Sequence, residues 1–144
     1  MKTAKLALHT EMTVLEFLET ASKLERRLDR SLSIRGISFS EFRLLRAMAE
    51  AKPSGLARID LATTVGLTAS AVTRALKPLE KIGCVTTQRN KRDARQSLTL
   101  ITQAGLELLE DAQGALDDVL RGLPLNTLSR QQVRELRNRL VDLR

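Results

Sequence analysis

Apolar side chains recur at steps of three or four residues through most of this chain, which predicts a mainly helical protein. The first such stretch runs from about Glu11 to Leu32, where leucines, Val14 and Ala21 alternate with charged residues. At about 1.5 Å per residue, a helix of that length is longer than a small core needs. We therefore expect part of its apolar stripe to contact another chain.

Capping sequences predict three shorter helices outside the centre of the chain. The sequence SFSE at residues 38–41 resembles a capping box, and the helix that it opens ends before Pro53. Thr102 can cap a later helix, and Ser129 with Gln132 supplies a second capping box for the last one. Apolar residues then follow at helical spacing in both of these segments.

The centre of the chain predicts two helices joined by a tight turn. A short helix at about 58–65 ends at Gly66, and a second helix follows at about 69–82. Ala62 is small where the two helices must cross, and Val72 is placed to fill their shared core. This spacing is the signature of a helix-turn-helix, whose second helix enters the major groove of DNA.

One face of this second helix carries short polar and basic side chains. The candidate DNA contacts on it are Thr68, which also caps the helix, Ser70, Thr73, Arg74 and Lys77. The major groove admits a helix with short polar side chains near its N-terminus and an arginine able to pair with guanine. The alternative interpretation is the ordinary solvent-exposed face of an amphipathic helix.

A β-hairpin with a basic tip is predicted directly after this helix. β-branched residues at 85–89 and 96–101 flank the turn sequence NKRDAR. Seven basic and two acidic side chains fall between Thr68 and Ser97, so most of the net charge of +7 lies here. A basic tip attracts phosphates and suits a narrow A·T-rich minor groove, although it could serve solubility alone. The candidate contacts are Arg89, Lys91, Arg92 and Arg95.

Composition indicates one soluble domain. A chain of 144 residues with 42% hydrophobic side chains is long enough for a single core. Its apolar runs stay below the roughly 18 residues that a membrane span needs, and its start lacks the pattern of a signal peptide. We therefore expect a cytoplasmic protein without membrane contact.

Enzymatic and metal chemistry are not expected. One cysteine, Cys84, and one histidine, His9, leave no cluster to bind zinc, and the sequence predicts no cofactor. It also lacks a nucleophile with its base, paired carboxylates or a phosphate-binding loop, so we expect no enzyme. We interpret Cys84 as a buried structural thiol, while a redox role stays open.

Two stretches, SAVTRALKPLEKIGCV at 70–85 and DARQSLTLITQAG at 93–105, carry a recurring pattern. The second contains an Asp-x-Arg step and an apolar-Thr-x-x-Gly step. Together they resemble the winged helix-turn-helix of the MarR family of bacterial transcription regulators. Thr99 departs from the pattern, because an apolar strand residue is usual there, and this leaves the strand register open. The matching positions are Ser70, Val72, Thr73, Arg74, Leu76, Leu79, Glu80, Gly83, Asp93, Arg95, Ile101, Thr102 and Gly105.

The resemblance implies a mainly α fold with a small β-hairpin wing in a single MarR-like domain. The winged helix-turn-helix would occupy about 37–102, and the segments at about 1–36 and 103–144 would form a homodimer interface. The helix after Gly66 would read the major groove. Arg95 would reach the adjacent minor groove, braced by Asp93.

For function, the resemblance implies a sequence-specific, DNA-binding transcription regulator. It would be a homodimeric repressor on a pseudo-palindromic operator in double-stranded DNA, released by a small aromatic or anionic ligand. We expect such a ligand near Phe17, Phe39 and Phe42, between the dimer helices and the winged segment. The alternative is a protein-interaction module that uses a winged-helix surface without reading bases.

Overall fold

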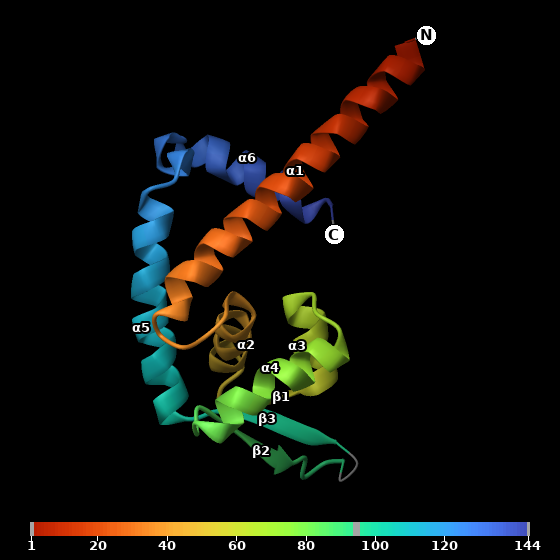
Figure 1. Cartoon of the computed structure of the whole chain (residues 1–144). Helices are drawn as coiled ribbons and strands as arrows, with labels where there is room; N and C mark the ends of the chain where they lie inside the picture. The colour runs from red at the N-terminus through yellow and green to blue at the C-terminus, as the bar shows by residue number, and fades with distance from the viewer. Residues whose placement is uncertain (1, 94–95, 144) are drawn as a thin grey trace.

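The computed structural model describes residues 2–93 and 96–143 and is mainly helical, with one small antiparallel sheet (Figure 1). The helices are α1 (Lys2–Ser33), α2 (Phe39–Glu50), α3 (Arg58–Val65), α4 (Ala69–Lys81), α5 (Gln103–Arg121) and α6 (Arg130–Val141), with a 3-10 helix η1 at Pro124–Thr127. The strands are β1 (Leu56–Ala57), β2 (Val85–Arg89) and β3 (Ser97–Ile101). The predicted fold class, mainly α with a β-hairpin wing, is confirmed.

Three details differ from the sequence prediction. Helix α1 begins at Lys2 rather than near Glu11, because residues 2–10 are rich in alanine, leucine and lysine, which favour continued helix. Helix α4 ends at Lys81, one residue before the predicted end, and Ile82 is 58% exposed. Strand β1 was not predicted, since two residues carry no periodicity.

The capping residues act as predicted. The Ser38 hydroxyl accepts a hydrogen bond from the Glu41 backbone N–H at 3.1 Å, and the Ser38 N–H donates to the Glu41 carboxylate at 2.6 Å. Ser129 and Gln132 make the same reciprocal pair at the start of α6. Each box satisfies two backbone donors that a helix start would otherwise leave unpaired.

The sheet has the order β1-β3-β2, with both pairings antiparallel. The register places Val85 opposite Ile101 and Arg89 opposite Ser97. Thr99, the position that departs from the family pattern, lies in the central strand and is completely buried. Among the described atoms its hydroxyl has no hydrogen-bond partner, so a polar group occupies an apolar position at some cost in stability.

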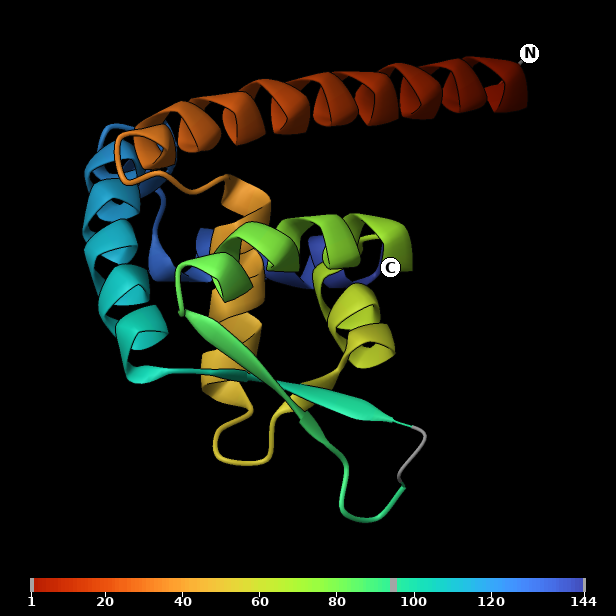
Figure 2. The same ribbon diagram turned by 60° about the horizontal axis from the view of Figure 1, so that its bottom comes forward.

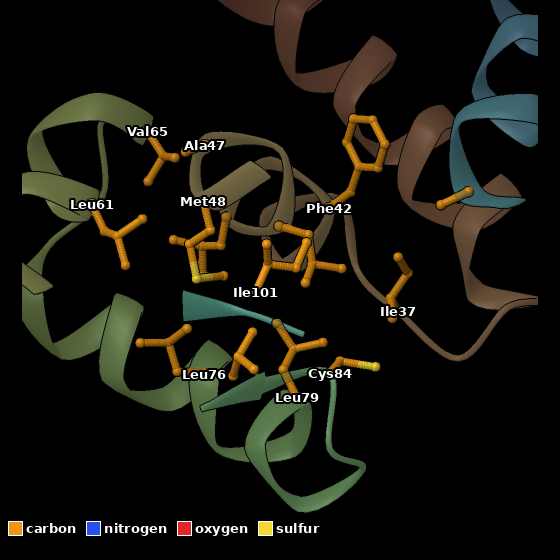
Figure 3. Packing of buried hydrophobic residues seen from close by; sticks show 14 of the residues in the cluster. Ile37, Phe42, Ala47, Met48, Leu61, Val65, Leu76, Leu79, Cys84 and Ile101 are labelled. Carbon is orange, nitrogen blue, oxygen red and sulfur yellow. The ribbon is translucent and has the colours of Figure 1, made fainter. Parts of the chain in front are cut away.

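The core lies between α2, α3, α4 and the sheet, and Figure 3 shows side chains of these elements converging on one volume. The fully buried leucines are Leu32, Leu44, Leu45, Leu61, Leu76 and Leu79. Burying each of them stabilises the fold by about 1.5–3 kcal/mol relative to an exposed side chain. The C-terminal part of α1 joins this core through Leu28 and Leu32, and α5 joins it through Ala112 and Leu116.

The two terminal helices extend beyond this core. The N-terminal half of α1 projects away from the rest of the chain in both views (Figures 1 and 2), and residues 9–23 are all exposed. Every described residue from Ser129 to Leu143, which includes all of α6, is also exposed. The apolar side chains of these segments therefore lie uncovered in the single chain.

Candidate nucleic-acid interface

Helix α4 presents one apolar and one polar face, as the sequence predicts. Val72, Leu76 and Leu79 are completely buried and fix the helix on the core. On the other side Ser70, Arg74 and Lys77 are exposed, and Thr73 is half-buried. The candidate base contacts on this helix therefore lie on the face that does not pack against the core.

The start of α4 is set by its cap and by the turn before it. The Thr68 hydroxyl accepts a hydrogen bond from the Ala71 N–H at 3.1 Å, so this candidate DNA contact also serves the helix. Gly66 has φ +66°, a left-handed conformation that glycine adopts without strain. The Arg43 guanidinium, from α2, donates to the Val65 carbonyl just before this turn.

The base of the hairpin is closed by the residues of the Thr-x-x-Gly step. The Thr102 hydroxyl donates to the Gly83 carbonyl at 2.6 Å and accepts from the Gly105 N–H at 3.2 Å. The Thr102 N–H donates to the Cys84 carbonyl at 3.0 Å. A Cβ atom on Gly105 would overlap that same carbonyl, which explains why the step needs glycine. These contacts join the end of α4, the hairpin and the start of α5.

The hairpin extends away from the helices toward its tip (Figure 2). Arg89, Lys91 and Arg92 are exposed along it. The Asn90 side chain accepts from the Arg92 N–H at 3.0 Å, which confirms Asn90 as a turn residue. Arg95 lies outside the described residues, so its predicted bracing by Asp93 stays a prediction.

Sequence reasoning missed a cluster that links α3, α4 and β2. The Arg58 guanidinium lies 3.5 Å from Oε1 of Glu80, and the Thr87 hydroxyl donates to the same oxygen at 3.1 Å. Arg58 and Glu80 are separated by 22 residues, so no local pattern could indicate their pairing. The sequence signals at Glu80 were its acidic charge inside a strongly basic stretch and its match to the family pattern.

Cys84 is 5% exposed at the base of the hairpin, which confirms its interpretation as a buried thiol. Burial raises the pKa of this thiol, because the charged thiolate loses its hydration there. The nucleophilic thiolate form is correspondingly disfavoured at neutral pH.

The three phenylalanines proposed near a ligand do not all come together. The rings of Phe39 and Phe42 are stacked with centroids 6.2 Å apart, and Arg43 lies over Phe39 at 5.9 Å. An open hollow of about 410 Å³ between α1 and the start of α2 has Phe39, Glu25 and Arg26 among its lining residues. Phe42 is buried in the core, and Phe17 lies on the exposed half of α1.

Within residues 2–93 and 96–143, no helix is both long and apolar enough to cross a membrane. The same residues contain no group of three or more histidine, cysteine, aspartate or glutamate side chains placed to hold a metal ion.

Known proteins resemble this chain in part by sequence and more fully by fold. Residues 35–96 match the sequence model of the MarR family, while no curated protein matches the chain. The DNA complex of Staphylococcus aureus MepR shares 19% identity over 88% of this chain and 90% of that chain, with a TM-score of 0.77. Rhodococcus jostii RHA1 CouR bound to p-coumaroyl-CoA shares 22% over 88% of each chain, with a TM-score of 0.76.

Escherichia coli MarR in its apo form shares 22% identity over 89% of this chain and 93% of that chain, with a TM-score of 0.70. The matched segment contains α2, α3, α4 and β2, which together with β3 carry most of the candidate interface. The resemblance to the MarR family seen in the sequence is thus confirmed over residues 35–96, and the fold of the chain is similar to the folds of MepR, CouR and MarR.

Proposed function

We propose that this chain is a bacterial, cytoplasmic, sequence-specific DNA-binding regulator without enzymatic activity. It binds a pseudo-palindromic operator as a homodimer, represses transcription and is released by a small ligand. The observation that carries this proposal is the exposed face of α4, with Ser70, Arg74 and Lys77 free beside a basic hairpin. The MepR complex with DNA supports it, since a similar fold is known to bind DNA there.

Helix α4 and the hairpin would make different kinds of contact with DNA. Ser70, Thr73, Arg74 and Lys77 would meet base edges and phosphates in the major groove, where arginine pairs with guanine. The exposed Arg89, Lys91 and Arg92 would neutralise phosphates, and Arg95 would enter the minor groove. Phosphate contacts position the protein on the duplex, while base contacts specify the sequence.

Homodimerisation is supported by the uncovered apolar side chains of the terminal helices. Leu15 and Leu18 of α1 are 53% and 54% exposed, and Leu136 of α6 is 42% exposed. A large apolar surface of this kind favours association with another chain. Two-fold symmetry would place two copies of α4 about one DNA turn, roughly 34 Å, apart.

Ligand control is supported by CouR, which has a similar fold and was solved with p-coumaroyl-CoA bound. In this chain we place the ligand in the hollow beside Phe39, between α1 and α2. A ligand there would change DNA affinity only by favouring one arrangement of the two α4 helices over another.

A mobility-shift assay with the intergenic DNA upstream of the chain's own gene tests this proposal. We expect the wild-type protein to bind one site in that DNA much more tightly than a scrambled duplex of the same composition. The Arg74→Ala variant should lose most of this preference. Failure to bind any duplex at low salt would favour the protein-interaction module instead.

A further inference from the structure

Glu80 is, with Asp93, one of two acidic residues in the basic stretch between Thr68 and Ser97. It lies on the last turn of α4, between Lys77 and Lys81 in the sequence, and β2 carries Arg89 nearby along the chain. A carboxylate close to DNA phosphates weakens binding through like-charge repulsion. Its presence therefore calls for a role that offsets this cost.

The contacts of Glu80 suggest what that role is. One carboxylate oxygen receives the Thr87 hydroxyl of β2 at 3.1 Å and lies 3.5 Å from the Arg58 guanidinium of α3. The carboxylate is only one-third exposed, so solvent screens these contacts less than it would at an open surface. One atom thus joins both helices of the helix-turn-helix to the first strand of the hairpin.

These three elements must keep a fixed mutual orientation if the proposed binding mode holds. Helix α4 and the hairpin tip enter adjacent grooves of one duplex, so rotating the hairpin about its base would displace the tip from its groove. The backbone already fixes the base of the hairpin through Thr102 and Cys84. Thr87 lies on β2 two residues beyond Val85 and so further from the base of the hairpin. A contact made by its side chain can therefore resist that rotation.

We propose that Glu80 is a positioning residue for DNA recognition, which sets the angle between α4 and the wing by binding Arg58 and Thr87 together. This inference rests on the proposed DNA-binding function. Its consequence is that Glu80 raises selectivity while lowering general affinity for DNA, because it aligns two sets of contacts and also repels phosphates.

The test measures affinity for two duplexes with the full-length wild type, Glu80→Gln, Thr87→Val and Arg58→Gln. The duplexes are the sequence that the wild type selects from a random pool, and a scrambled version of it. For Glu80→Gln we expect the ratio of the two affinities to fall by on the order of tenfold, the size of one misaligned base contact. Affinity for the scrambled duplex should instead rise by roughly twofold as one negative charge is lost.

Thr87→Val should lower the ratio without raising affinity for the scrambled duplex, because it changes no charge. Thr86→Val is its matched control, since Thr86 is also exposed on β2, whereas the hydroxyl that donates to Glu80 is that of Thr87. Glu110→Gln on α5 is the control for removing a negative charge elsewhere. Both controls should keep the wild-type ratio.

The double variant Arg58→Gln/Glu80→Gln tests whether the two residues act as one unit. Residues that act together are not additive, so the double variant should lose about as much selectivity as Glu80→Gln alone. A lowered melting temperature with an unchanged affinity ratio in Glu80→Gln and Thr87→Val would show a merely structural role and overturn the inference. A wild type that binds no DNA would overturn the proposed function and this inference together.

Discussion

Helices α4 and α6 share an amphipathic pattern but meet very different surroundings in the single chain. In α4 the apolar residues Val72, Leu76 and Leu79 are fully buried. In α6 Leu136 and Leu140 remain 42% and 38% exposed. The core therefore lies mainly in the winged segment, whereas α6 and the N-terminal half of α1 present apolar side chains that their own chain does not cover.

This difference indicates that the two regions are stabilised in different ways. The winged segment is stabilised within one chain, by core packing and by contacts such as those of Thr102 at the hairpin base. The terminal helices would gain most of their stability by associating with a second chain, which makes that stability depend on protein concentration. Four predictions, from the largest expected effect to the smallest, test the comparison.

Truncating the core of the winged segment should have the largest effect. We expect Leu45→Ala to lower the free energy of unfolding by about 2–5 kcal/mol, because it removes a fully buried side chain and leaves a cavity. Urea denaturation measures this. Ile59→Ala, at a position 63% exposed in the same segment, should change stability by only about 0.5 kcal/mol. Similar losses for the two variants would remove the distinction between core and surface.

Polar substitution in the terminal helices should act on association instead. We expect Leu18→Ser and Leu136→Ser each to weaken dimerisation by about 1–3 kcal/mol, since each removes apolar surface that the partner would bury. Sedimentation at several protein concentrations measures this. The control Ile59→Ser should sediment like the wild type. A wild type that is monomeric at micromolar concentration would contradict the proposal for these helices.

Substitutions in α4 and in the hairpin should reduce DNA affinity in different ways. Arg74→Ala should cost about 1–3 kcal/mol on the selected duplex and far less on a scrambled one, because base contacts specify the sequence. Arg95→Ala, and likewise Arg92→Ala, should weaken binding to both duplexes. Each should flatten the plot of log affinity against log salt by about one unit per lost phosphate contact. Equal losses on both duplexes for Arg74→Ala would exclude it from base reading.

The smallest effect concerns Cys84. Burial raises its pKa, so above about pH 8.5 the unfolded chain releases the thiol proton while the folded chain still holds it. Stability should therefore decrease as pH rises through that range. The chain has no tyrosine, and comparison with Cys84→Ala separates the thiol from the amino groups that also titrate there. Cys84→Ala should show a shallower decrease when unfolding is followed from pH 8 to pH 10, and an identical slope would contradict this origin.

Elements governed by local sequence were predictable, and elements that depend on distant residues were not. The caps at Ser38, Thr68 and Thr102 act on backbone groups three residues away, so their sequence context sufficed. Strand β1 exists because Leu56 pairs with Thr99, 43 positions later in the chain. No pattern within two residues could indicate such a partner.

The same distinction between local sequence and distant residues applies to the candidate site. The exposed face of α4 followed from helical periodicity, since burial of Val72 and Leu76 leaves Ser70 and Arg74 on the other side. The pairing of Arg58 with Glu80 needed the three-dimensional fold. Phe17 and Phe39 were both expected near a ligand, but Phe39 lines the hollow at the start of α2 while Phe17 is exposed on α1 and is not among the lining residues.

The most direct test of dimeric DNA binding is the number of chains bound to DNA, measured by sedimentation of the complex. Two duplexes are compared: one with two half-sites one helical turn apart, and one with a single half-site. If the chain binds DNA as a homodimer, two chains should bind the first duplex in one step, and binding to the second should be much weaker. One chain bound equally well to either duplex would contradict it.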